Sequence, residues 1–503
     1  MTTELIHPTD HHQPRPRRTE LTSIEPIIGG FHPDPTICRV GDDYYLANSS
    51  FEYAPGVPIW HSTDLISWKL IGNALSTVQQ FAPGHAAAGM GIYAPTLRYH
   101  DGRFWLITTD VSRGGGHLVV SAEHAAGPWS EAIVIAGVDG IDPDLAWDID
   151  GACYLSYCSG TPDMPGIAQV RVDLDRGVAL ERPRIIWAGT GLAYPEGPHL
   201  YRIGEWWYLL IAEGGTERGH AVSIARARTP QGPFESNPGN PFFSHRSLTR
   251  PVQNTGHADL VQNADDSWSM VYLGVRSAGP TPWFHVNGRE TFLAGLDWRE
   301  EWPVVDETRY RAPVPDRSFG DDFTAATLNP RWVSPGRGRE LAHRDGGPGL
   351  LLAAAGDPRD ALMARVTDRR WRFSAEIMLA GAAGSVMLRV DDEHNTTVTV
   401  DGSTATARLR IGPLDSTLGA TSIVPAGRVT VFVTAHESAA GPDDIALSID
   451  DGAGEQELAR FDGRYLSTEV AGGFTGRVVG VRSDRGSVRL LRVRYEAEDA
   501  YLL

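Results

Sequence analysis

A fivefold repeat runs through the first 310 residues and constrains the fold more than any other feature of the chain. Each copy has a short apolar segment, a polar turn and a second, aromatic-rich apolar segment. The copies begin at Asp34, Ala94, Asp142, Glu196 and His257 and close at Leu46, Leu106, Leu155, Leu209 and Met270, with spacings of 12, 12, 13, 13 and 13 residues. Repeats of about 50 to 60 residues that consist of strands and tight turns are typical of a β-propeller, so the sequence predicts five blades.

The segments between these copies support an all-β fold. Apolar and polar residues alternate over Tyr208 to Ala212 and over His220 to Ala225, as expected for strands. A doubly wound α/β domain needs long amphipathic helices between its strands, and the sequence offers none with a clear helical period. The sequence therefore predicts a five-bladed β-propeller over residues 25–310.

The repeat stops after Trp302-Pro303, and a different pattern follows. The Pro-rich residues 311–318 are predicted to be a linker, and residues 1–24 to be a polar N-terminal arm. From Phe319 onward, alternating segments are separated by Gly and Asp turns, which predicts an antiparallel β-sandwich over residues 319–503. Strands are expected over 371–378, 385–390, 396–400, 406–411, 429–434 and 488–493.

Composition excludes several classes of function. Lys69 is the one lysine, so chemistry that needs a placed lysine has a single position available. The chain has 45 basic and 63 acidic residues, and the net charge of −18 argues against a nucleic-acid partner or an anionic membrane. It has neither a run of about 18 apolar residues nor the apolar stretch of a signal peptide. We therefore expect a cytoplasmic protein, and a homo-oligomer remains open. Cys38, Cys153 and Cys158 are expected to be buried and unpaired.

The first residues of the five copies carry the chemistry. In a propeller the innermost strand of every blade lines a central channel, so equivalent positions point toward one another. Asp34, Asp142, Glu196 and His257 should therefore meet at one end of the channel, where three buried carboxylates repel one another. Such a group suits glycosidic bond cleavage, which needs one carboxylic acid and one carboxylate. Asp144 lies two residues beyond Asp142, points the same way along its strand, and is an alternative to it.

Longer motifs around these residues resemble a known family. The chain is similar to glycoside hydrolase family 43, and most of all to its β-xylosidases and α-L-arabinofuranosidases that carry a C-terminal β-sandwich. The resemblance covers residues 26 to about 305, in the order Gly30-Phe31-His32-Pro33-Asp34-Pro35-Thr36, Ser49-Ser50-Phe51-Glu52-Tyr53, Gly91-Ile92-Tyr93-Ala94-Pro95-Thr96, Ile141-Asp142-Pro143, Tyr194-Pro195-Glu196-Gly197-Pro198, Ala212-Glu213-Gly214-Gly215-Thr216-Glu217, Thr255-Gly256-His257-Ala258-Asp259-Leu260 and Gly288-Arg289-Glu290-Thr291.

This resemblance implies an exo-acting, inverting glycoside hydrolase. Its substrates would be short xylan- or arabinan-derived oligosaccharides, from which it would release β-D-xylose, α-L-arabinofuranose or both. Asp34 would be the general base that deprotonates the attacking water, and Glu196 the general acid for the leaving sugar. Asp142 would raise the pKa of Glu196 and orient it. Asp148 and Asp150 are expected to belong to the turn that follows.

The resemblance also suggests how the sugar is held. Arg289 would bind the hydroxyls of the pentose, which suits the several fixed donors of a guanidinium. Phe51 and Tyr93 are candidate walls against the sugar ring, although Trp is frequent in the family at the position of Tyr93. His257 occupies the fifth inner position, near which related propellers hold a calcium or another ion. The resemblance thus admits a structural ion, and it implies neither a required cofactor nor a catalytic metal.

Two other functions are weighed against this one. A non-catalytic, sugar-binding propeller is expected to lack at least one of Asp34, Asp142 and Glu196, and all three are present. A retaining propeller that cleaves fructan or sucrose is expected to carry its nucleophile in Asn-Asp-Pro, where this chain has Pro33-Asp34-Pro35.

Overall fold

The computed structural model describes residues 25–161, 164–310, 315–354, 356–423 and 427–498. The predicted N-terminal arm and the first half of the predicted linker lie outside the described residues. The described chain is almost entirely β, with five small sheets followed by two larger ones. This confirms the predicted fold class, a five-bladed β-propeller followed by an antiparallel β-sandwich.

Each blade is one antiparallel sheet whose strands follow in chain order from the inside outward, except that the last two strands of blade 3 both pair with its third strand. Blade 1 has β1 (Thr36–Val40), β2 (Asp43–Ala47), β3 (Gly56–Ser62) and β4 (Lys69–Leu75). Blade 2 has β5 (Thr96–His100), β6 (Arg103–Thr108), β7 (His117–Ala122) and β8 (Ile133–Ile135). Blade 3 has β9 (Gly140–Trp147), β10 (Cys153–Ser159), β11 (Ile167–Asp173), β12 (Val178–Ala179) and β13 (Arg184–Trp187). Blade 4 has β14 (Glu196–Ile203), β15 (Trp206–Glu213), β16 (Ala221–Ala227) and β17 (Glu235–Ser236), and blade 5 has β18 (Val252–Gln262), β19 (Trp268–Arg276), β20 (Glu290–Arg299) and β21 (Trp302–Asp306).

The inner strands close into a ring. Each of β1, β5, β9, β14 and β18 contacts the inner strand of the next blade, and β18 contacts β1. The segment before β1 joins the first blade to the last, because Ile28 pairs with Thr291 of β20 and the His32 N–H donates to the Arg289 carbonyl at 3.0 Å. The five inner strands therefore surround one channel, as the repeat predicts.

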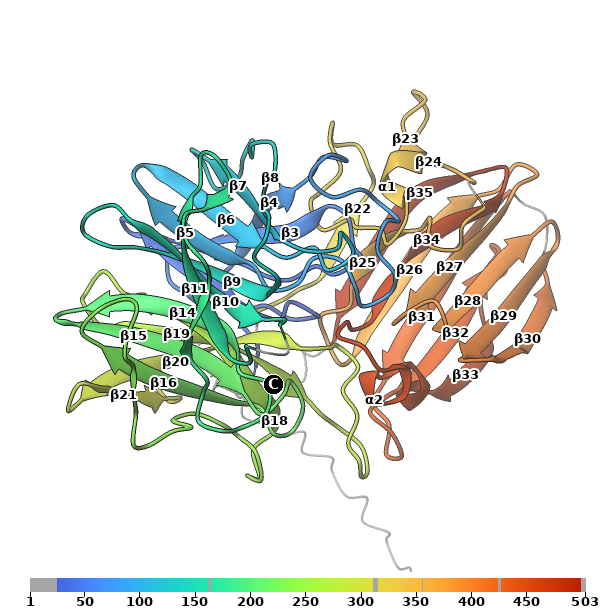
Figure 1. Cartoon of the computed structure of the whole chain (residues 1–503). Helices are drawn as coiled ribbons and strands as arrows, with labels where there is room; N and C mark the ends of the chain where they lie inside the picture. Colours follow the sequence, from blue (N-terminus) through green and yellow to red (C-terminus); the bar gives the residue numbers. More distant parts are fainter. Residues whose placement is uncertain (1–24, 162–163, 311–314, 355, 424–426, 499–503) are drawn as a thin grey trace, which may run out of the picture.

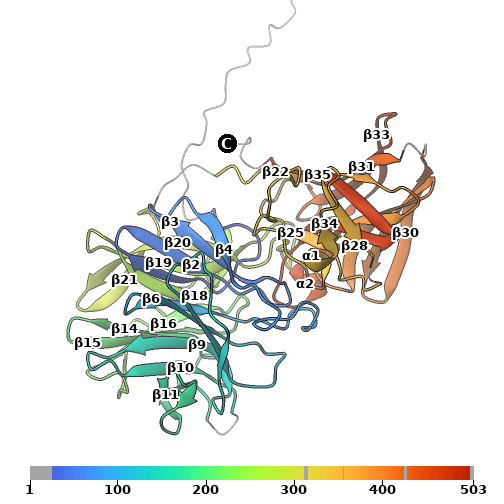
Figure 2. The ribbon, with the colours of Figure 1, turned by 90° about the horizontal axis from the view of Figure 1, so that it is seen from above.

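The sandwich lies beside the propeller (Figures 1 and 2). One sheet has the order β23-β24-β35-β26-β31-β32-β33 with β22 paired to β35, and the other has the order β25-β34-β27-β28-β29-β30. Their strands are β22 (Phe319–Asp321), β23 (Ala342–His343), β24 (Leu350–Ala353), β25 (Leu362–Arg365), β26 (Trp371–Met378), β27 (Ala383–Arg389), β28 (His394–Asp401), β29 (Thr404–Ile411), β30 (Leu414–Ser422), β31 (Arg428–His436), β32 (Asp444–Asp450), β33 (Glu455–Asp462), β34 (Val478–Arg485) and β35 (Ser487–Ala497). The helical turns α1 (Gly338–Leu341), η1 (Gly463–Leu466) and α2 (Thr468–Ala471) complete it. The sequence predicts β26 to β29, β31 and β35, and the other strands add to them.

An apolar cluster joins the two parts. Phe31, Phe51 and Tyr53 from the propeller pack with Met363, Met387 and Val478 from the sandwich. The Ala54 and Ser334 backbones pair in the same region, with N–H to carbonyl distances of 2.8 Å in both directions. The sandwich is therefore fixed against the face of the propeller that carries Phe51.

Two further expectations concern membranes and cysteines. Within the described ranges, no helix has both the length and the apolar character that are needed to cross a bilayer. Cys38, Cys153 and Cys158 are free thiols; the first two are buried as expected, whereas Cys158 at the end of β10 is only half-buried.

Candidate active site

A cavity of about 490 Å³ lies at one end of the propeller channel and contains all seven residues predicted for the site. Asp34 precedes β1, Asp142 lies in β9, Glu196 begins β14 and His257 lies in β18. Phe51, Tyr93 and Arg289 come from loops beside them and complete the predicted set. The other lining residues are Ala94, Ile141, Tyr194, Gly214, Gly215, Thr216, Glu217 and Phe474.

The backbone has the same unusual conformation at equivalent points of three blades. Asp34, Asp142 and His257 have φ values of 53°, 55° and 44°, in the left-handed region that side chains other than glycine seldom adopt. Such strain persists only where surrounding structure holds it, and it is frequent at functional sites. In blade 4 the left-handed residue is Gly197, next to Glu196, with φ 56°. The repeat therefore specifies the direction of the inner carboxylates as well as their positions.

Asp34 is buried and held by positive and hydroxyl groups. Its Oδ1 accepts a hydrogen bond from Arg289 Nη1 at 3.1 Å and lies 3.6 Å from His257 Nδ1. Its Oδ2 accepts a short hydrogen bond from the Ser49 hydroxyl. Burial by itself raises the pKa of Asp34, but Arg289, His257 and Ser49 outweigh it and hold that pKa below its ordinary value. Asp34 is therefore a carboxylate near neutral pH.

Asp142 and Glu196 form a coupled pair with the opposite behaviour. Burial, followed by the charges of Glu196 and Asp34, raises the pKa of Asp142 well above its ordinary value. Burial and Asp34 raise the pKa of Glu196 to about 7. The pair therefore retains a proton near neutral pH. Asp142 Oδ2 accepts the Gly197 N–H at 3.1 Å, which lowers the pKa of Asp142 but does not outweigh burial and the neighbouring carboxylates.

Arg289 lies between two aromatic rings. Its guanidinium carbon is 5.7 Å from the centre of the Phe51 ring and 5.3 Å from that of Phe474. Besides Asp34, its Nη1 donates to the Thr216 hydroxyl at 3.0 Å. Tyr93 lies edge-on to both rings, with centroid distances of 5.7 Å to Phe51 and 5.8 Å to Phe474. The Arg289 guanidinium and the three aromatic rings thus form one wall of the cavity, and this wall is cationic and apolar where the carboxylates are acidic.

Phe474 belongs to the sandwich and was not predicted for the site. Its loop is held against the propeller, because Arg477 N donates to the Val286 carbonyl at 3.1 Å. Gly476 is essential to this approach, since a Cβ there would lie 2.3 Å from the Asn287 carbonyl oxygen. The glycines on both sides of Phe474, at 472, 473 and 476, are the sequence signal for this close loop. Ser49 and Thr216 are also unpredicted contacts, although both lie inside quoted motifs.

The alternative to Asp142 is excluded from the cavity by geometry. Asp144 does not line it, and its carboxylate accepts a hydrogen bond from Arg98 Nη2 at 2.8 Å and another from the Leu200 N–H at 2.9 Å. Asp148 and Asp150 lie at the turn after β9, where they were expected. Of these carboxylates, only Asp142 faces the cavity.

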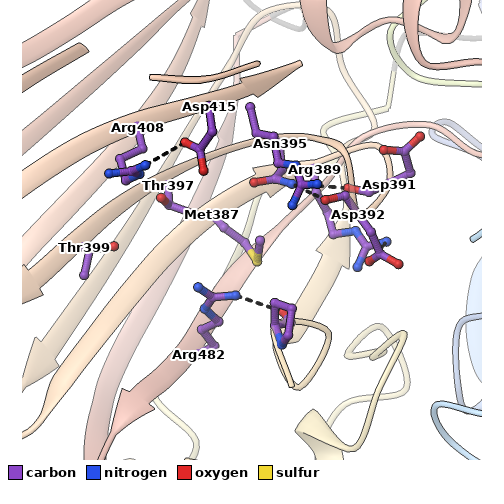
Figure 3. A pocket seen from close by; sticks show the side chains of 12 residues that line it. Met387, Arg389, Asp391, Asp392, Asn395, Thr397, Thr399, Arg408, Asp415 and Arg482 are labelled. Atoms are coloured by element: carbon purple, nitrogen blue, oxygen red, sulfur yellow. Dashed lines mark hydrogen bonds and ion pairs between the residues drawn. The ribbon is translucent and has the colours of Figure 1, made fainter. Parts of the chain in front are cut away.

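A second hollow lies on the six-stranded sheet of the sandwich (Figure 3). It measures about 210 Å³, and its charged groups are largely paired with one another. Arg408 bonds Asp415 at 2.9 Å, and Arg389 Nη2 lies 3.2 Å from Asp392 Oδ1. It contains none of the predicted site residues, so the channel cavity is the candidate active site.

Comparisons with known proteins agree with this geometry. The sequence model of glycosyl hydrolases family 43 matches residues 24–303, more than half of the chain. The chain belongs to glycoside hydrolase family 43. A non-reducing end α-L-arabinofuranosidase of Bacteroides ovatus is 36% identical over 92% of this chain and 91% of its own length. A xylosidase/arabinosidase of Butyrivibrio fibrisolvens is 44% identical over 56% of each chain.

Solved structures extend the likeness to both domains. The family 43 protein from a xyloglucan locus of Bacteroides ovatus superposes with a TM-score of 0.86 and 31% identity, covering 95% of this chain and all of its own. A xylan β-1,4-xylosidase of Bacillus halodurans gives a TM-score of 0.84 and 26% identity, covering 94% and 99%. This family 43 chain is therefore a glycoside hydrolase. A non-catalytic, sugar-binding propeller is therefore excluded, and membership of family 43 disfavours a retaining propeller that cleaves fructan or sucrose.

The structural ion near His257 stays a prediction, and the side chains there suit it poorly. Among the described residues, Asp142, Glu196 and His257 form a group whose ligand atoms lie within 4.8 Å of one another. Calcium prefers six to eight oxygen ligands, and a cation here would also strip the proton from Glu196. One ring nitrogen of His257, Nδ1, lies 3.6 Å from Asp34 Oδ1. The residues present therefore do not fit a calcium ion at this position.

Proposed function

We propose that this glycoside hydrolase is an exo-acting pentosidase that inverts the anomeric centre in a single displacement. One observation carries the proposal: within one cavity, Asp34 has a lowered pKa, whereas the pKa of Glu196 is raised to about 7. Two carboxyl groups whose environments separate their pKa values are suited to act as base and acid in the same step.

Asp34 acts as the general base. It is ionised at neutral pH and removes a proton from the water that attacks the anomeric carbon. Arg289 and Ser49 hold its two oxygens and so orient the carboxylate. The bond from water to the anomeric carbon forms on the face opposite the leaving oxygen, which inverts the configuration.

Glu196 acts as the general acid. It gives its proton to the glycosidic oxygen as the bond to the anomeric carbon breaks, so that the leaving sugar departs as a neutral alcohol. Asp142 is a positioning residue, because it shares a proton with Glu196 near neutral pH and its bond to the Gly197 N–H fixes the backbone next to the acid. His257 lies beside Asp34 and lowers its pKa.

A single non-reducing-end pentose is the proposed occupant of the cavity. Arg289 binds its hydroxyls, and Phe51, Tyr93 and Phe474 contact the ring. Because Phe474 comes from the sandwich, the second domain closes one side and favours release of one terminal sugar at a time. The names of the relatives, arabinofuranosidase and xylosidase, support β-D-xylosides and α-L-arabinofuranosides as substrates. The proposed cytoplasmic location agrees with short oligosaccharides as substrates.

The test is hydrolysis of aryl β-D-xylopyranoside and aryl α-L-arabinofuranoside, with short xylo- and arabino-oligosaccharides as natural substrates. We expect turnover of at least one class, release of single pentoses, and the inverted anomer as first product by proton NMR. Absence of turnover on both aryl glycosides contradicts the pentosidase assignment. A retained first anomer contradicts the single displacement even if the substrates are correct.

A further inference from the structure

A second layer of polar side chains crosses the propeller channel beyond the carboxylates of the cavity. It contains one residue from each inner strand: Thr36 of β1, Arg98 of β5, Asp144 of β9, His199 of β14 and Asp259 of β18. Thr36, Asp144 and Asp259 stand two residues beyond Asp34, Asp142 and His257. We call these five residues the channel network.

Arg98 is the centre of the channel network. Its Nη1 donates to Asp259 Oδ2 at 2.8 Å and to the Thr36 hydroxyl at 3.3 Å. Its Nη2 donates to Asp144 Oδ1 at 2.8 Å and lies 2.9 Å from His199 Nδ1. One guanidinium thus reaches the inner strands of the four other blades.

The oxygens of the network are already in use. Asp259 Oδ2 accepts from Arg98, from the Thr36 hydroxyl at 2.9 Å and from the Ile37 N–H at 2.9 Å. Its Oδ1 accepts from the Tyr201 hydroxyl at 2.5 Å and from the Leu260 N–H at 2.9 Å. Asp144 is bonded through both oxygens, to Arg98 and to the Leu200 N–H. A divalent cation would have to displace these donors and approach a guanidinium of like charge.

We propose that Arg98 is an internal cation that performs the structural task of a channel ion, so that this enzyme needs no divalent metal. Arg98 neutralises the buried carboxylates of Asp144 and Asp259 and joins the five inner strands whose neighbouring residues form the catalytic site. It is a positioning residue, because it touches neither the cavity nor the sugar. The Arg98 guanidinium contacts all four other inner strands, and hydrogen bonds from protein donors occupy both Asp259 oxygens.

A consequence follows for Arg98→Met. This change removes the charge and the donors but keeps an unbranched side chain of comparable length. Two buried carboxylates, the Thr36 hydroxyl and the Tyr201 hydroxyl then face one another without a cation. That set is rich in oxygen and negatively charged, which are the properties that a calcium site requires. Arg98→Met should therefore acquire a dependence on calcium that the natural chain lacks.

The first measurement uses the wild-type enzyme. After dialysis against EDTA, we expect far less than one bound divalent metal per chain by mass spectrometry, with unchanged kcat, KM and Tm. Calcium added back should alter none of these values. About one tightly held calcium per chain, or a Tm that falls with EDTA and recovers with calcium, overturns the proposal. Metal content and Tm do not depend on turnover, so an error in the pentosidase assignment is recognised separately by loss of activity on both aryl glycosides.

The second measurement compares variants. We expect Arg98→Met to have a lowered Tm and a kcat reduced at least tenfold at unchanged pH optimum, and millimolar calcium to raise both values toward wild type. Arg98→Lys retains a positive charge and should show a smaller loss that calcium does not repair. Arg103→Met, at an exposed arginine of the next strand, is the matched control and should behave as wild type. Wild-type behaviour of Arg98→Met without calcium contradicts the proposal. If Arg98→Met does not fold with or without calcium, the wild-type metal content and Arg98→Lys decide the question.

Discussion

The active site and the channel network are two layers of buried carboxylates on the same inner strands, two residues apart, yet they differ in how far their charge is compensated. In the network, burial alone would raise the pKa of Asp259, but Arg98 and the hydrogen-bond donors hold it well below its ordinary value. In the active site, burial and mutual repulsion raise the pKa of Asp142 and Glu196. Arg289 reaches Asp34 but is bonded to neither member of that pair.

The difference teaches how one repeat gives both a rigid scaffold and a reactive site. A buried carboxylate with a full set of donors is stable as an anion and contributes to the fold. A buried carboxylate without a cation keeps its proton and is able to transfer it. In this propeller, the placement of arginine, rather than the placement of the acids, separates the two layers.

The largest effect is expected where the active-site layer loses its proton donor. Glu196→Gln should lower kcat/KM on oligosaccharides by about 10²–10⁴-fold, the usual contribution of a general acid. The loss should be smaller on aryl glycosides, because an activated leaving group departs without a proton. Initial-rate assays on both substrates measure the two losses, and Glu205→Gln, at an exposed glutamate of the β14–β15 turn, is the control. Equal, mild losses on both substrates would remove Glu196 from the acid role.

The pH dependence of the wild-type enzyme tests the same proton. The acid must be protonated to act, so kcat/KM should fall as the pH rises through the pKa of Glu196, which is about 7. Above that value the expected decline is about tenfold per pH unit. The decline should be absent in Glu196→Gln, which has no proton to lose. A flat profile from pH 6 to 9 in the wild type would contradict a raised pKa at this site.

A change in the channel network should lower the free energy of unfolding. Asp259→Asn leaves Arg98 without its main partner, and breaking a buried ion pair costs about 3–5 kcal/mol. The pKa of Asp259 is lowered in the folded state, so its contribution is fully present above the unfolded pKa of about 3.9 and is lost as the pH falls toward the folded value. Urea unfolding should therefore show a constant deficit from pH 7 to 5. Asp42→Asn, in the exposed β1–β2 turn, is the control. Wild-type stability of Asp259→Asn would mean that the network adds nothing to the fold.

A smaller effect is expected when the active-site layer loses its own arginine. Arg289→Ala removes a charged hydrogen bond to Asp34 and the proposed bonds to the sugar, and a net loss equal to one such bond, about 1.5–3 kcal/mol, lowers kcat/KM by about 10- to 100-fold. The pKa of Asp34 should rise, because Arg289 lowers it, and the acid limb of the pH profile should move upward. Arg228→Ala, at an exposed arginine on blade 4, serves as the control. An unmoved acid limb would show that Arg289 does not set the charge state of Asp34.

The sequence predicts the part of this architecture that repeats. Equal spacing places Asp34, Asp142, Glu196 and His257 at equivalent points of the blades, and the structure brings all of them into one cavity. The same spacing cannot reveal Arg98, because it stands four residues beyond Ala94 and reaches the axis only through the length of its side chain. Nor can it reveal Phe474, which arrives from a different domain through a tertiary contact without local periodicity. The sequence pattern likewise does not distinguish Asp142 from Asp144, because their different hydrogen-bond partners are known only from the structure.

Phe474 gives the smallest expected effect and tests whether the sandwich takes part in catalysis at all. Aromatic contacts of this kind are worth about 0.5–1.5 kcal/mol, so Phe474→Ala should raise KM by about 2- to 12-fold. Its ring stacks with Phe51 at 6.1 Å and lies 5.3 Å from the Arg289 guanidinium carbon, while the hydrogen bond from Arg289 to Asp34 does not involve Phe474. Tyr465→Ala, at an exposed tyrosine of η1 in the same region, is the control for damage to the sandwich. Because Phe474 touches neither Asp34 nor Glu196 in the described structure, both limbs of the pH profile should stay in place while KM rises. A shift of either limb would mean that the second domain influences the proton transfers as well as the fit of the sugar.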